Sequence, residues 1–155
     1  KKIETQFLGY YLKWVPQENF YYAVQNTGFL ANTERIEGTY QKYASLDDKV
    51  DGFFYYTSHI KFGYGRATAQ ISMDIRRGNI ERSEALEFVI KNEGTFPKTY
   101  LDKSLKEILS EIEMTLDQFI DISDKFTNKK IFKTLPDGNL KKDNNLNLTK
   151  INYDN

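Results

Sequence analysis

The spacing of apolar residues along the chain predicts a mainly α domain of about five or six helices. Apolar side chains recur three and four positions apart, which places them on one face of a helix. A glycine or a capping residue bounds most of these stretches, as expected where helices begin and end. The predicted helices cover residues 16–28, 45–62, 67–78, 85–93, 105–112 and 115–126.

Two of the predicted helix starts carry a chemical signature. Ser45 precedes two aspartates, so we expect its hydroxyl to cap the second helix, with both acids at the positive end of the helix dipole. Thr115 and Gln118 have the spacing of a capping box. Met114 and Phe119 flank that box at the positions of a hydrophobic staple, which makes the last helix the clearest of the set.

Both ends of the chain depart from the helical pattern. Residues 7–14 form a short, aromatic-rich run that favours a β-strand. A single strand needs neighbours, so we expect it to pair with a sheet upstream or with another chain. After Lys133 the chain is polar and rich in Asn, which predicts a turn and a loose tail. The predicted division is residues 1–15, a helical domain at 16–133 and a tail at 134–155.

Composition and charge narrow the classes of function. Lys+Arg and Asp+Glu both number 22, and this zero net charge does not favour nucleic-acid binding. The absence of cysteine excludes disulfides, thiolate metal sites and cysteine nucleophiles. No apolar run approaches the ~20 residues of a membrane span, and no signal-peptide pattern opens the chain. We therefore expect a cytoplasmic protein, and the start at Lys1 indicates a trimmed or processed terminus.

A glycine-containing corner between two predicted helices is the strongest candidate site. It covers the segment Lys-Phe-Gly-Tyr-Gly-Arg that begins at Lys61. Gly63 and Gly65 let backbone N–H groups approach a ligand closely, and the next helix begins with unpaired donors. Lys61 and Arg66 add positive charge, and a guanidinium can hold an oxyanion with two hydrogen bonds. The spacing favours either a phosphate-binding site or an ordinary turn between helices, and it leaves both open.

Other chemically interesting residues have simpler structural interpretations. His59 is the only histidine, and its aromatic neighbourhood favours a packed or surface role over that of a catalytic base. Asp47, Asp48 and Asp51 are candidate Mg²⁺ ligands, but helix capping accounts for the first two. The acidic face predicted within residues 81–113 is expected to be solvated. The sequence therefore predicts no catalytic residue in this chain.

Several short motifs, in order along the chain, resemble a known family. They are Glu37-Gly-Thr-Tyr40, Tyr43-Ala-Ser-Leu-Asp-Asp-Lys49, Asp51-Gly-Phe-Phe-Tyr-Tyr56, Ile60-Lys-Phe-Gly-Tyr-Gly-Arg-Ala-Thr68, Asp74-Ile-Arg76, Glu84-Ala85 and Gly94-Thr-Phe-Pro97. Together they are similar to the C-terminal part of the bacterial N-acetyl sugar amidotransferases of lipopolysaccharide and surface-glycan biosynthesis. The similarity extends over residues 7–132, and the linked motifs are more specific than any one of them.

The resemblance implies an ATP-dependent reaction. These enzymes contain an ATP-pyrophosphatase domain with a Ser-Gly-Gly-Lys-Asp-Ser phosphate loop and use ATP with Mg²⁺. They convert the acetamido group of a nucleotide-linked or acidic N-acetyl sugar to an acetamidino group, with ammonia from glutamine. Some work with a glutaminase subunit. By this resemblance, phosphate-binding roles are expected for Lys61, Gly63, Gly65 and Arg66, and substrate-binding roles for Tyr40 and Arg76. For Arg76 a structural role in pairing with a charged residue is equally open.

This chain departs from the full family pattern, because the phosphate loop and the cysteines expected upstream are absent. His59 and residues 70–73 also differ from the family pattern. Residues 1–15 would then hold a late strand of an upstream nucleotide-binding domain, and the chain alone would be inactive and bind no ATP tightly. The alternatives are a non-enzymatic helical module that docks a glutaminase partner through its acidic face, or a stand-alone phosphate binder. The sequence leaves a homodimer open.

Overall fold

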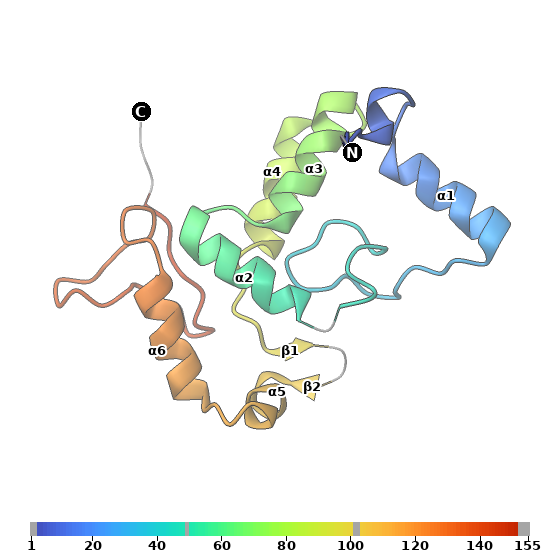
Figure 1. Ribbon diagram of the computed structural model, residues 1–155. Helices are drawn as coiled ribbons and strands as arrows, with labels where there is room; N and C mark the ends of the chain where they lie inside the picture. Colours follow the sequence, from blue (N-terminus) through green and yellow to red (C-terminus); the bar gives the residue numbers. More distant parts are fainter. Residues whose placement is uncertain (1–2, 49, 101–102, 152–155) are drawn as a thin grey trace.

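The computed structural model describes residues 3–48, 50–100 and 103–151, and within them the chain is mainly helical, as predicted (Figure 1). No helix in these ranges combines the length and the apolar character that crossing a bilayer requires. The elements, in chain order, are a 3₁₀ helix η1 (Leu8–Tyr10), α1 (Pro16–Thr27), α2 (Asp51–Phe62), α3 (Arg66–Arg77), α4 (Arg82–Asn92), β1 (Thr99–Tyr100), β2 (Lys103–Ser104), α5 (Leu105–Glu111) and α6 (Leu116–Phe126).

Helix α2 occupies the centre of the fold, between the α3–α4 pair and α6 (Figure 1). Its Tyr56 and Ile60 form the core cluster together with Phe96, Leu105 and Leu109. Ile60 is completely buried, so a polar residue there would lose its hydration without gaining a partner. Because residues on both sides of α2 are packed against it, α2 sets the position of the corner that leads into α3.

The predicted start of the last helix is confirmed. The hydroxyl of Thr115 accepts the backbone N–H of Gln118, and the side chain of Gln118 accepts the backbone N–H of Thr115. Met114 and Phe119 both pack against the core cluster, as a hydrophobic staple requires. Ser104 forms a second capping box at the start of α5, which the sequence analysis did not single out.

The predicted cap at Ser45 is wrong. Helix α2 begins at Asp51, and Ser45 lies in the preceding loop with a φ of 60°. The Ser45 hydroxyl forms a short hydrogen bond with the hydroxyl of Tyr55. Asp48 accepts the backbone N–H of Val50, the residue that caps α2. The Ser45 hydroxyl therefore bonds to the Tyr55 side chain of α2 and does not cap the backbone of that helix.

The predicted strand at residues 7–14 is also wrong. Leu8–Tyr10 forms the 3₁₀ helix η1, and the residues up to α1 pair with no strand that the structure describes. The two strands described, β1 and β2, form an antiparallel pair elsewhere in the chain. A strand is stable only when its backbone groups are paired, and without a partner the local turn at Gly9 prevails. The segment leaves Phe7 80% and Tyr10 86% exposed.

The expectation of a loose tail is wrong for residues 134–151, and residues 152–155 lie outside the described part of the chain. Backbone bridges join Phe132 to Lys150, Thr134 to Leu140, and Lys142 to Leu148. Phe132 is fully buried, and Leu146 and Leu148 pack against the core cluster. The ordered tail could not be predicted from its polar composition, because only a few widely spaced apolar side chains attach the segment to the core.

We expect Asn147→Ala to lower the free energy of unfolding by about 1–2 kcal/mol, because it removes a side-chain acceptor from a part-buried backbone donor. The amide oxygen of Asn147 accepts the backbone N–H of Phe96 at 2.8 Å and so fastens the tail to the core. Urea denaturation followed by circular dichroism measures the change. Asn144→Ala is the matched control, since Asn144 is exposed and forms no hydrogen bond with a described residue. Equal stability of the two variants would contradict an anchored tail.

Candidate functional site

A buried carboxylate occupies the start of α3, at the corner singled out from the sequence. Glu93 immediately follows α4, and its Oε2 accepts the backbone N–H of Thr68 at 2.7 Å. The Thr68 hydroxyl donates to Oε1 at 2.8 Å, and the backbone N–H of Gly65 also donates to this carboxylate. A helix start attracts negative charge through its free N–H groups and its dipole. The corner therefore binds an anion, and that anion is the protein's own Glu93.

His59, on α2, faces the same carboxylate. Its Nδ1 lies 3.6 Å from Oε1 of Glu93, and the two side chains are only 7% and 2% exposed. Burial raises the pKa of Glu93, but the contact with His59 and the hydrogen bonds from Thr68 and Gly65 outweigh it and hold the pKa below its usual value. A packed or a surface position was expected for His59, and the structure places its side chain in the interior, beside the Glu93 carboxylate.

A small cavity lies beside this pair. Its volume is about 10 Å³, enough for roughly one water molecule. Arg66 lies on its wall with Tyr55, and the guanidinium carbon is 5.9 Å from the centre of the Tyr55 ring. The Tyr55 hydroxyl donates to Oδ2 of Asp51 at 3.1 Å. The cavity is too small for a phosphate group, so any phosphate that meets Arg66 does so from the outer surface.

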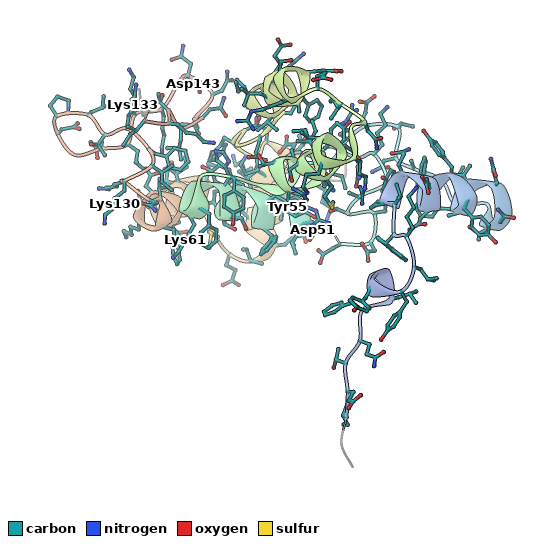
Figure 2. The ribbon with its side chains drawn as sticks, turned by 90° about the horizontal axis from the view of Figure 1, so that it is seen from above. Asp51, Tyr55, Lys61, Lys130, Lys133 and Asp143 are labelled. Atoms are coloured by element: carbon teal, nitrogen blue, oxygen red, sulfur yellow. The ribbon has the colours of Figure 1, made fainter. Side chains whose placement is uncertain are left out.

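The structure separates the four residues predicted to bind phosphate into two groups. Gly65 and Arg66 lie together at the start of α3. Lys61 projects toward α6, with its ammonium 5.3 Å from the centre of the Phe126 ring. Figure 2 shows Lys61 on the side of Lys130 and Tyr55 on the side of α3. A single small anion is therefore not held by Lys61 and Arg66 in this arrangement.

Gly63 ends α2 with a φ of 79°, a conformation that favours glycine. A Cβ at this position would lie 2.9 Å from a methyl carbon of Ile131, so the chain passes too close for a larger residue. The backbone conformation and the close approach of Ile131 both explain why glycine occupies this position. Phosphate binding by Gly63 stays a prediction.

The two predicted substrate-binding residues lie apart from the corner. The backbone N–H of Tyr40 donates to Oε1 of Gln70 at 2.7 Å, and its ring packs edge-on against Phe88. Burial raises the pKa of the Tyr40 hydroxyl, with a further contribution from Asp74. Arg76 is exposed near the far end of α3, roughly 15 Å along the helix from Arg66. Their substrate roles stay predictions.

Glu93 and Thr68 are the residues that sequence reasoning missed. Glu93 was assigned to a solvated acidic face, and that expectation is wrong for this residue because its side chain is 2% exposed. The partners of Glu93 lie 25 and 34 positions earlier in the chain, so no local spacing reveals them. The one available signal was its place directly before Gly94, where a helix ends.

Comparison with protein families matches residues 37–146 to the family described as LPS biosynthesis protein WbpG-like, C-terminal domain. The chain belongs to this family. It is therefore a C-terminal domain of a protein of lipopolysaccharide biosynthesis, which confirms the coarser part of the resemblance seen in the motifs. A comparison with curated proteins gives no match.

The described residues of this WbpG-like domain do not fit ATP with Mg²⁺ at the corner. Two of the backbone donors that a phosphate would use at the start of α3, those of Gly65 and Thr68, are taken by Glu93. Within the described ranges, no three His, Asp or Glu side chains gather as ligands for a metal ion. No step through the nucleotide is therefore assigned to the corner.

Proposed function

We propose that this domain is the C-terminal part of an ATP-dependent N-acetyl sugar amidotransferase. The enzyme converts the acetamido group of a nucleotide-linked or acidic sugar to an acetamidino group, in the cytoplasm, with ammonia derived from glutamine. ATP and Mg²⁺ bind an upstream ATP-pyrophosphatase domain, and the present chain is inactive alone. The observation that carries the proposal is the family match over residues 37–146, which puts the domain in lipopolysaccharide biosynthesis.

The occupied corner supports the assignment of nucleotide binding to the upstream domain. A helix start filled by a buried carboxylate repels a second anion, so nucleotide phosphates are better held by another domain. Arg66 is the cation best placed to contact a ligand held by the upstream domain, because its side chain is exposed and rests on Tyr55 beside the corner. In the proposal Arg66 contacts the pyrophosphate or the anionic part of the substrate. Phosphate binding by Lys61 and Gly63 and substrate binding by Tyr40 and Arg76 stay predictions, whereas the backbone N–H of Gly65 already donates to Glu93.

We expect Arg66→Ala to lower the rate of the parent enzyme by about tenfold, the loss of one charge-assisted contact to an oxyanion. The assay uses the protein with its upstream domain and follows ATP- and ammonia-dependent modification of a nucleotide-linked acetamido sugar. Arg82→Ala is the control, because Arg82 is exposed on α4, away from the corner. An unchanged rate in Arg66→Ala would remove Arg66 from the site.

A second candidate function is a non-enzymatic module that docks a partner such as a glutaminase subunit. The exposed aromatic residues around η1 and α1 favour it, since helix α1 buries none of its described residues. Contiguous apolar surface of this kind marks interaction sites. Restoring the upstream domain separates the two functions: ATP-dependent modification of the sugar supports the enzyme, and stable binding of a glutaminase without any ATP-dependent reaction supports the module.

A further inference from the structure

A large pocket lies between α4 and the ordered tail, and neither the motifs nor the proposed function assign it a role. Its volume is about 620 Å³, within the range of pockets that bind small molecules. We call it the tail pocket. It is lined by His59, Leu86, Val89, Ile90, Lys91, Glu93, Gly94, Thr95, Asp143, Asn147, Leu148 and Lys150.

One wall of the tail pocket is apolar. Leu86 and Ile90 lie four positions apart on α4, so they share a face of the helix, and Leu148 of the tail also lines the pocket. Leu86 is 51% and Ile90 74% exposed, although both are large aliphatic residues. Covering this wall with the hydrocarbon part of a ligand would remove apolar surface from water, which favours binding.

The tail pocket is lined by two lysines and two carboxylates, and the two kinds of charged group differ in their contacts with the described residues. Its two carboxylates are already supplied with donors: Glu93 by the α3 corner, and Asp143 by the backbone N–H groups of Asn145 and Asn147 and the Asn147 side chain. Lys91 and Lys150 line the same pocket, and neither side chain has a hydrogen bond or ion pair with a described residue. The two lysines therefore have no partner among the described residues, whereas both carboxylates already accept hydrogen bonds.

His59 contributes a further polar group to the wall. Its Nδ1 is buried and has no hydrogen-bond partner among the described residues, with Glu93 at ion-pair rather than hydrogen-bond distance. Buried polar atoms without a partner are uncommon in native proteins. A ligand in the tail pocket would change the surroundings of this ring.

We propose that the tail pocket binds a small anionic amphiphile, with its hydrocarbon part against Leu86 and Ile90 and its phosphate or carboxylate group between Lys91 and Lys150. This site adjoins the α3 corner, because His59 and Glu93 line the tail pocket as well, but its two lysines lie outside the corner. It does not depend on the proposed amidotransferase reaction, since it rests only on the pocket, its apolar wall and its unpaired cations.

The experiment uses hexyl phosphate as the probe and NMR of the chain as the readout. His59 is the only histidine, so its ring resonances report on the tail pocket without ambiguity. Titration is expected to shift the His59 Hε1 signal and the methyl signals of Leu86 and Ile90 along one saturable curve. Inorganic phosphate and hexanol, each carrying half of the proposed chemistry, are expected to bind more weakly. A linear, non-saturating response, or no response at His59, would overturn the site.

Substitutions separate the charge contribution from the apolar one. Lys91→Gln and Lys150→Gln are each expected to weaken hexyl phosphate binding by about two- to fivefold, the effect of an exposed ion pair. Lys141→Gln is the matched control, an exposed lysine of the tail outside the pocket, and should leave affinity unchanged. Ile90→Gln should weaken the probe and leave inorganic phosphate unaffected. Equal affinities for Lys91→Gln, Lys150→Gln and Lys141→Gln would show that the cations play no part, and the proposal would fail.

Discussion

Replacing Gly94 with alanine is expected to destabilise the domain by about 4 kcal/mol, a large part of the total stability of a typical domain. A Cβ built on Gly94 lies 2.2 Å from Nε2 of His59 and 2.7 Å from two ring carbons. The ring has little freedom to withdraw, because Glu93 lies on one side and the Phe132 ring centre is 5.5 Å away. Gly94 also has a φ of 79°, a conformation that disfavours any side chain.

The two causes can be separated with a matched glycine. Gly78 has a φ of 74° and no atom within 4 Å of an added Cβ, so Gly78→Ala carries the backbone strain alone, about 1 kcal/mol. The cost of Gly94→Ala should fall to a similar value when it is measured in a His59→Ala background, since the clash is then removed. Thermal and urea denaturation of the wild-type protein, Gly94→Ala, His59→Ala and the double variant give this cycle, and Gly78→Ala is measured beside them. If Gly94→Ala is no worse than Gly78→Ala, the close approach of His59 to the Gly94 backbone is wrong.

Features that depend on neighbouring residues could be predicted from the sequence. The end of α3 at Gly78 follows from the local pattern of apolar residues and a glycine, and the structure confirms it. The capping box at Thr115 is equally local, because its two hydrogen bonds join residues three positions apart. Ser45 shows the limit of this reasoning. Its hydroxyl had two competing partners, a helix backbone nearby and a Tyr55 ring, and only the folded chain decides between them.

The candidate site depends on contacts between residues that are distant in sequence. Arg66 and Gly65 were found because glycines beside cations form a recognisable pattern. Glu93 could not be found this way, since the donors that bury it lie on α2 and at the start of α3. The same reason explains the tail, where Leu148 and Phe132 pack only after the chain has folded back. A polar composition predicts an exposed segment on average, but a few buried apolar side chains are enough to hold such a segment against the core.

Glu93→Ala is expected to lower the free energy of unfolding by about 3–5 kcal/mol, because the donors on Thr68 and Gly65 lose their acceptor at about 1–3 kcal/mol each. The substitution removes the carboxylate beside Nδ1 of His59 and leaves the backbone N–H of Thr68 without its acceptor. Glu93→Gln keeps an acceptor for Thr68 and is expected to cost about half as much. Glu81→Ala is the control, because Glu81 is exposed before α4. Equal stability of all three variants would refute a buried role for Glu93.

The pH dependence of stability gives a second, independent measure of the same carboxylate. Its folded-state pKa lies below the ordinary value of 4.5, so the ionised form favours the folded state. That stabilisation is fully present above pH 4.5, where the carboxyl is ionised in both states, and is lost as pH falls through the lower folded pKa. Glu93→Gln cannot lose it, so the stability difference between the wild-type protein and this variant should shrink as the solution is acidified below pH 4.5. A difference that stays constant down to pH 3 would show that the pKa of Glu93 is the same in the folded and unfolded states, so the corner would not favour the ionised carboxylate.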